Sequence, residues 1–255
     1  MRVRTEELDL ARTTGRMRVF IARPEAAGRF PALAFSSDIF QLGESTQRMA
    51  IRFASYGFVV AAPEVYWRFE PPGTVFAFDD AGRERGLARA HDTSVADFDD
   101  DLAALHAHLL ARSDVDPDAL GAVGFCLGGH LAFRAAFAPD VRATACFYPT
   151  GLHDGALGGD VADSLARARD IRGALSLAFG TRDPHTTAAQ RERIVAEMAT
   201  AGVDSRVETF DAEHAFMRDV GPRYDAQAAD AAFGAAIAFL RATFARSHQR
   251  AQYVS

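Results

Sequence analysis

The sequence predicts an α/β fold, with a mostly parallel central sheet and helices on both faces. Short runs rich in β-branched and aromatic residues alternate with longer segments whose apolar residues have helical spacing. This alternation is typical of a parallel sheet that helices cover on both sides. No Ser-rich or Pro-rich stretch separates two folding units, so we expect a single domain over residues 1–255, with a polar tail from about residue 246.

Seven runs have the composition of sheet strands. Most of them are five to seven residues long, which is the usual length of a strand. In chain order, the predicted strands are Met17–Ala22, Pro31–Ser36, Phe58–Ala62, Ala119–Phe125, Ala143–Tyr148, Leu175–Gly180 and Arg206–Phe210.

Five segments between or after these strands are predicted helices. They are Thr46–Ser55, Val95–Arg112, His130–Ala138, Thr187–Ala201 and Ala226–Phe244. Two segments break the alternation. Residues 70–90 have no clear period, and residues 148–160 are rich in glycine and aspartate, so we expect both to be loops over the ends of the sheet, where loops often line sites. The tail after Arg246 is predicted to be frayed.

The composition excludes several classes of protein. With 28 Lys plus Arg against 34 Asp plus Glu, the formal net charge is −6 and no basic cluster is present, which argues against a nucleic-acid partner. The N-terminal stretch is charged and the apolar runs are short, so we expect a cytoplasmic protein without a membrane segment. Two cysteines make no disulfide framework, and no zinc motif is present, so we expect no metal and no cofactor.

The strongest motif is a glycine-rich turn at residues 124–130, with the sequence GFCLGGH, between a predicted strand and a predicted helix. It has the form of a nucleophile elbow with Cys126 as the nucleophile. A sharp reversal leaves no room for side chains two residues before and after the turn, which explains Gly124 and Gly128. The helix N-terminus favours a thiolate. The backbone N–H of Leu127 would point to where an acyl oxyanion forms.

Either cysteine could instead be a small buried hydrophobic residue, which is the commonest fate of an intracellular cysteine. The strand-turn-helix setting favours the nucleophile for Cys126. Cys146 lies inside a strand-like run, so we assign it to the core.

A thiol nucleophile needs an orienting acid and a base, which in this architecture follow it along the chain in that order. Asp183 follows the strand Leu175–Gly180, although an aspartate before Pro184 could also form an Asx turn. His214 follows the strand Arg206–Phe210, although a lone histidine is often a surface or capping residue. Taken together, these positions match an acid and a base.

From about residue 17 to residue 242, the sequence resembles the dienelactone hydrolase family of the α/β-hydrolase fold. The resemblance lies in GFCLGG at 124–129, GTRD at 180–183 and EHAFMR at 213–218. Cysteine at the elbow is the specific feature, because most relatives of this fold use serine.

The resemblance implies a triad of Cys126, His214 and Asp183. It also implies an oxyanion hole formed by the backbone N–H groups of Leu127 and Ile39.

The resemblance implies a carboxylate near the thiol as well. The family usually has a glutamate there, which contacts the resting thiol and shifts when substrate binds. Asp38 stands at the matching position. Its side chain is one methylene shorter than that of glutamate, which argues against activation of the thiol by a shifting carboxylate. His214 acting directly as the base would be sufficient for catalysis.

In the family, two arginines bind a carboxylate of the substrate. The matching residues are Arg218 and Arg83, with Arg85 or Arg89 as alternatives to Arg83. Either could also be a solvated surface charge. A tyrosine that often follows the first arginine is replaced by Leu87.

We therefore predict a cofactor-free hydrolase that opens small esters or lactones, carboxylate-bearing ones above all, through a thioester on Cys126. Aromatic side chains at positions 66, 67, 76 and 78 would line its pocket or belong to the core. One alternative is a carboxylesterase or acyl-transfer enzyme for neutral esters, which the departures at Asp38 and Leu87 favour. Another is a non-catalytic ligand-binding or redox-sensing protein on the same scaffold.

Overall fold

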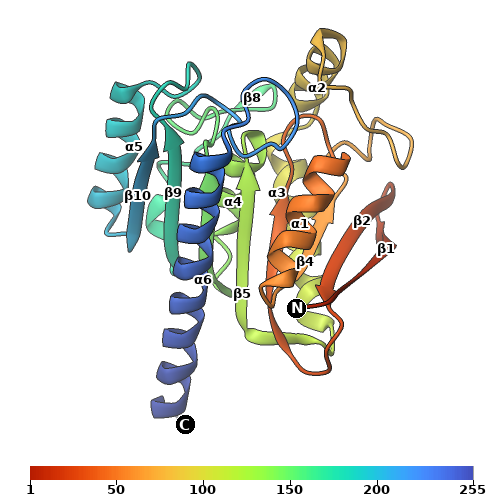
Figure 1. Cartoon of the computed structure of the whole chain (residues 1–255), viewed down its shortest axis with the longest axis vertical. Helices are drawn as coiled ribbons and strands as arrows, with labels where there is room; N and C mark the ends of the chain where they lie inside the picture. Colours follow the sequence, from red (N-terminus) through yellow and green to blue (C-terminus); the bar gives the residue numbers. More distant parts are fainter. Residues whose placement is uncertain (255) are drawn as a thin grey trace.

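The chain folds around an eight-stranded sheet with the strand order β1-β2-β4-β3-β5-β6-β9-β10 (Figure 1). The computed structural model describes the backbone of residues 1–254 and the side chains of residues 1–247. All pairs from β4 to β10 are parallel, whereas β1 and β2 pair with their neighbours in antiparallel fashion. The strands are β1 (Val3–Arg12), β2 (Gly15–Pro24), β3 (Phe30–Ser36), β4 (Val59–Pro63), β5 (Val115–Phe125), β6 (Val141–Phe147), β9 (Ala174–Gly180) and β10 (Ser205–Phe210).

Helices cover both faces of the sheet, which confirms the predicted fold class. Side chains of α1 and α6 share one buried cluster with the sheet, and side chains of α3, α4 and α5 share another on the opposite face. The helices are α1 (Glu44–Ser55), α2 (Asp80–Asp92), α3 (Val95–Ala111), α4 (Leu127–Ala135), α5 (Ala188–Ala201) and α6 (Ala226–Val254), with a 3₁₀ turn at Ala168–Asp170 and a small hairpin of β7 (Ala156–Leu157) and β8 (Asp160–Val161).

Three elements differ from the sequence prediction. The charged N-terminus forms β1, in which partly buried and exposed residues alternate as in an edge strand that is covered on one side. Residues 70–90 contain α2, whose N-terminus is capped because the Asp79 side chain accepts a hydrogen bond from the N–H of Gly82. Helix α6 continues past Arg246 to Val254, because no glycine or proline follows Gly234 to end it.

Helix α6 is apolar along much of its length. The segment Ala226–Ser247 is long and apolar enough to span a membrane by composition, with a mean hydropathy of 1.3. In the structure, however, its alanine, phenylalanine and leucine side chains pack into the cluster beneath the sheet. The helix is therefore part of the core.

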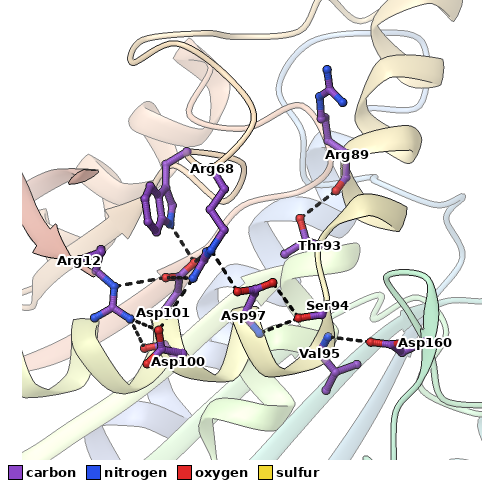
Figure 2. A network of polar contacts seen from close by, with 11 residues as sticks. Arg12, Arg68, Arg89, Thr93, Ser94, Val95, Asp97, Asp100, Asp101 and Asp160 are labelled. Carbon is purple, nitrogen blue, oxygen red and sulfur yellow. Dashed lines mark hydrogen bonds and ion pairs between the residues drawn. The ribbon is translucent and has the colours of Figure 1, made fainter. Parts of the chain in front are cut away.

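A network of ion pairs on α3 fixes the N-terminal hairpin and the loop after β4 (Figure 2). The carboxylate of Asp101 is mostly buried, pairs with Arg68 and Arg12, and accepts a hydrogen bond from Trp67 Nε1 at 2.9 Å. Arg12 also pairs with Asp100. Because these contacts hold residues 67 and 68, the loop that follows β4 has a fixed position at the carboxyl edge of the sheet.

Candidate active site

Cys126 lies at the sharp turn between β5 and α4, with φ 57° and ψ −121°. The turn requires glycine on both sides. A Cβ atom on Gly124 would lie 1.8 Å from the carbonyl oxygen of Gly128, and one on Gly128 would lie 2.1 Å from that of Ser36. The N–H of Cys126 donates to the carbonyl of Phe147 at 3.0 Å. Contacts with the neighbouring strands β3 and β6 therefore hold the turn in its strained conformation.

His214 and Asp183 meet at the same edge of the sheet. Both side chains are buried, and His214 Nδ1 lies 2.7 Å from Asp183 Oδ2. The other carboxylate oxygen, Asp183 Oδ1, accepts the backbone N–H of His185 at 2.8 Å. An ionised carboxylate only accepts, so Nδ1 carries the hydrogen and Nε2 is left for the thiol.

Electrostatics link this imidazole to the thiol. Burial lowers the pKa of His214, but the charge of Cys126 and the hydrogen bonds with Asp183 and Cys126 outweigh burial and raise the pKa to about 9. The structure therefore brings Cys126, His214 and Asp183 together.

Two aromatic neighbours that the sequence analysis did not single out flank His214. The rings of Tyr148 and His185 both meet it edge to face, with centroid distances of 5.1 Å and 4.7 Å. Tyr148 also has a positive φ of 37°, directly after β6. Only their positions in the sequence could have pointed to these two residues. Tyr148 ends a predicted strand, and His185 follows Asp183 by two residues.

The loop after β3 runs beside the elbow. A Cβ atom on Gly128 would meet the carbonyl oxygens of both Ser36 and Ser37. Within the described residues, the N–H groups of Ile39 and Leu127 donate no hydrogen bond to another protein group. Ile39 packs against the buried cluster that contains Leu127. These two N–H groups are thus available to an acceptor outside the protein.

Asp38 is bound to Arg218. Asp38 Oδ1 accepts the N–H of Phe40 at 2.9 Å, and Oδ2 accepts from Arg218 Nη1 at 3.3 Å. In the part of the chain that the structure describes, the thiol of Cys126 is not a hydrogen-bond partner of this carboxylate. Burial raises the pKa of Asp38, while Arg218 opposes the rise.

A small cavity of about 30 Å³, with both apolar and polar side chains in its lining, adjoins this ion pair. Ser37, Thr46 and Arg218 are among its lining residues. Ser37 Oγ and Arg218 Nε are buried and have no hydrogen-bond partner in the described chain. The guanidinium of Arg218 also lies over the ring of Phe78, 4.5 Å from its centroid.

Of the three candidate arginines on α2, two are already paired. Arg85 and Arg89 both bind the buried carboxylate of Glu70, with a distance of 2.6 Å between Arg89 Nε and Glu70 Oε1. Arg83 forms no ion pair with any described residue, and its charge is one of those that lower the pKa of His185, after burial and His214. This arrangement favours Arg83 as the arginine near the site.

The second cysteine and the possibility of a metal site were also considered in the sequence analysis. Cys146 is buried, and burial raises the pKa of its thiol. Among the described residues, no group of three His, Cys, Asp or Glu side chains is placed to hold a metal ion.

The family of the chain is shown by its sequence. The model of the dienelactone hydrolase family matches residues 17–244. The chain belongs to the dienelactone hydrolase family. Members of this family are carboxylic ester hydrolases, so the protein is an ester or lactone hydrolase that acts on small molecules. This result removes the non-catalytic alternative.

Two relatives illustrate the similarity of sequence. A Saccharomyces cerevisiae homologue named carboxymethylenebutenolidase is 33% identical over 212 residues, which cover 80% of this chain and 77% of the relative. The carboxymethylenebutenolidase of Pseudomonas sp. strain P51 is 27% identical over 225 residues, which cover 88% and 90%.

Solved structures of dienelactone hydrolase-like enzymes have the same α/β-hydrolase fold. A dienelactone hydrolase-like promiscuous phosphotriesterase from metagenomic libraries has a TM-score of 0.79, at 21% identity, with 94% of this chain and 98% of that chain covered. An esterase from Thermogutta terrifontis with bound propionate has a TM-score of 0.68, at 20% identity, with 92% and 93% covered.

Proposed function

We propose that this dienelactone hydrolase family member opens small esters and lactones through a thioester on Cys126. The observation that carries the proposal is the contact chain at the elbow, in which Asp183 binds His214 Nδ1 and His214 interacts with the Cys126 thiol. This chain of contacts supports the assignment of Cys126 as nucleophile, His214 as base and Asp183 as orienting acid.

The reaction proceeds in two halves. His214 Nε2 holds the thiol proton in the resting pair, and the Cys126 thiolate attacks the carbonyl carbon while the N–H groups of Leu127 and Ile39 bind the oxyanion. Each such donor contributes roughly 3 to 4 kcal/mol in related enzymes. The carbon–oxygen bond then breaks, and the imidazolium returns its proton to the leaving oxygen. A water molecule, deprotonated by His214, hydrolyses the thioester and leaves the Cys126 thiolate beside the imidazolium.

The leaving group limits the substrates. A thiolate is expelled more easily than an alkoxide, so the tetrahedral intermediate of a simple alkyl ester returns to the starting ester. An enolate or a phenolate leaves far more readily than an alkoxide and can therefore compete with the thiolate. We therefore expect enol lactones and activated esters to be the best substrates.

We propose that Cys126 is activated before the substrate binds. Asp38 is held by Arg218 and by the N–H of Phe40, whereas the thiol interacts with His214. We infer that His214 acts as the base without a preceding shift of Asp38. Iodoacetamide should then alkylate Cys126 rapidly below pH 7 in the absence of substrate. Alkylation that needs a substrate analogue, or a pH above 8, would argue against this step.

A carboxylate on the substrate has two candidate partners. Arg218 Nε and Ser37 Oγ line the small cavity without a partner, and Arg83 forms no ion pair. Replacing Arg218 or Arg83 by Met should raise KM for anionic substrates more than for neutral ones. An equal effect on both would favour the second candidate function, hydrolysis of neutral esters, which the existing pairing of Arg218 with Asp38 supports.

The nucleophile is tested by Cys126→Ala. This variant should lose hydrolysis of p-nitrophenyl acetate by at least 10³-fold. Cys146→Ala is the matched control, because it removes the other thiol from the core and should keep kcat. Retained turnover in Cys126→Ala would remove the proposal.

Two further proposals concern the setting of the enzyme. Cys126 and Cys146 are both free thiols, and free thiols persist in reducing compartments, so we propose a cytoplasmic location. We also propose that residues 1–255 form one domain, because both helical layers pack on one sheet.

A further inference from the structure

Tyr66 lies beyond the carboxyl end of β4, at the sheet edge that also carries Cys126. Its side chain is fully buried, and its ring stacks on Phe76 with a centroid distance of 6.0 Å. It belongs to the buried cluster that contains Leu127 and against which Ile39 packs. Tyr66 thus shares a buried cluster with Leu127 and Ile39, the two residues proposed to form the oxyanion hole.

The backbone of Tyr66 is fixed. Its N–H donates to Gln41 Oε1 at 3.1 Å, and its carbonyl accepts the N–H groups of residues 69 and 70. The next side chains along the chain, Trp67 and Arg68, bind Asp101 on α3 (Figure 2). Because the backbone is held in this way and the fully buried ring stacks on Phe76, the hydroxyl keeps its position.

The hydroxyl of Tyr66 is buried and has no hydrogen-bond partner among the described residues. Leaving such a donor unpaired costs about 1 to 3 kcal/mol. Burial, with the charges of Cys126 and Asp38 adding to it, raises the pKa of Tyr66 well above its ordinary value. The hydroxyl therefore stays protonated and is a donor.

Tyr148 provides a comparison within the same site. It is also buried and lies near Cys126 and Asp38, but its hydroxyl bonds to the backbone of Met217. Of these two buried tyrosines, Tyr148 thus has a protein partner for its hydroxyl, whereas Tyr66 has none among the described residues.

We propose that the Tyr66 hydroxyl donates a third hydrogen bond to the carbonyl oxygen of the substrate as Cys126 attacks, beside the N–H groups of Leu127 and Ile39. This inference rests on the proposed thioester mechanism. As the sulfur–carbon bond forms, the carbonyl π electrons move onto the oxygen. They return when the bond to the leaving oxygen breaks. Tyr66 keeps its proton throughout, so it stabilises the oxyanion without acid catalysis.

The test compares Tyr66→Phe with wild type in the pre-steady-state release of p-nitrophenolate from p-nitrophenyl acetate. The acylation rate should fall roughly 10²-fold, with KM changed less than about threefold, because the lost bond forms only in the transition state. The melting temperature should rise rather than fall, because the variant removes a buried hydroxyl that has no partner in the described part of the chain. Tyr56→Phe removes an exposed phenol and should match wild type in both measurements.

Alkylation of Cys126 by iodoacetamide distinguishes a role toward the oxyanion from a role toward the thiol. Displacement at a saturated carbon forms no oxyanion, so Tyr66→Phe should be alkylated at the wild-type rate. A parallel loss of alkylation and acylation would overturn the inference, and so would an acylation rate within threefold of wild type. If Cys126→Ala keeps turnover, the proposed function itself fails, whatever Tyr66→Phe does.

Discussion

Replacing Asp183 by Asn should reverse the tautomer of the base. Asp183 accepts two hydrogen bonds, from the backbone N–H of His185 and from His214 Nδ1. An asparagine has one accepting oxygen and one donating NH₂ group. The N–H of His185 can only donate, so the amide oxygen must turn toward it and the NH₂ group must turn toward His214.

The imidazole then has to accept at Nδ1 and carry its hydrogen on Nε2, where it cannot take the thiol proton. A tautomer change of this kind costs up to about 10⁴-fold in kcat in serine enzymes. A thiol is more acidic than a hydroxyl and depends less on the base, so we expect a loss of about 10³-fold, or roughly 4 kcal/mol of transition-state stabilisation.

Hydrolysis of p-nitrophenyl acetate at pH 7 measures this loss, and thermal unfolding checks that the variant is folded. Asp211→Asn is the matched control, because this exposed carboxylate contacts Arg182 and Thr181 near the same sheet edge and should leave kcat unchanged. A folded Asp183→Asn protein that keeps more than a tenth of wild-type kcat/KM would refute the role of Asp183 as the orienting acid.

Three further predictions concern stability. Because the folded-state pKa of His214 is about 9, its contribution is fully present below its ordinary pKa of 6.5 and is lost as pH rises through 9. The free energy of unfolding, measured by urea titration, should therefore fall by about 3 kcal/mol over that range, and a flat profile would contradict this. Gly128→Ala should lower the same quantity by more than about 3 kcal/mol, because the new Cβ collides with the Ser36 carbonyl. Gly234→Ala in α6, where an added Cβ would meet no atom within 4 Å apart from the adjacent backbone of its own helix, should raise it by about 0.5 to 1 kcal/mol, and similar losses in both variants would refute the steric argument. Asp101→Ala should cost about 1 to 3 kcal/mol, because Trp67 Nε1 loses its acceptor while Arg68 keeps only Asp97 and Asp100, and a loss below about 0.5 kcal/mol in calorimetry would exclude that role.

The elbow could be predicted from sequence because its signal is local. Gly124 and Gly128 are required by contacts within the turn and with the adjacent strand, so the motif itself reports the geometry. The positions of Asp183 and His214 follow from the strands that precede them, since parallel strands end at a common edge. The family model and the sheet confirm the fold and the family; the catalytic roles remain predictions.

The partners of long polar side chains could not be predicted in this way. Asp38 and Arg218 are 180 residues apart, and only the packing of two loops decides that they pair. Likewise, the choice among the arginines of α2 depends on Glu70, which binds Arg85 and Arg89 from the preceding loop.

Two elements were missed because their apolar patterns are weak. Helix α2 has few apolar residues, and a capping aspartate and ion pairs to Glu70 stabilise it. Strand β1 carries charges on its exposed face, so its composition suggests a charged terminus although its alternation indicates a strand.

The two sulfur atoms are separated by the sheet itself. Cys126 packs at the edge of the cluster formed with α1 and α6, whereas Cys146 lies in the cluster on the other face. A thiol-specific dye should therefore label one thiol per native chain. The labelled fraction then measures how many chains in a preparation have an intact Cys126 thiol. Because no second thiol can reach Cys126, a sulfenic acid formed there by peroxide cannot be captured as an intrachain disulfide. Recovery from oxidation then depends on small thiols supplied by the cell.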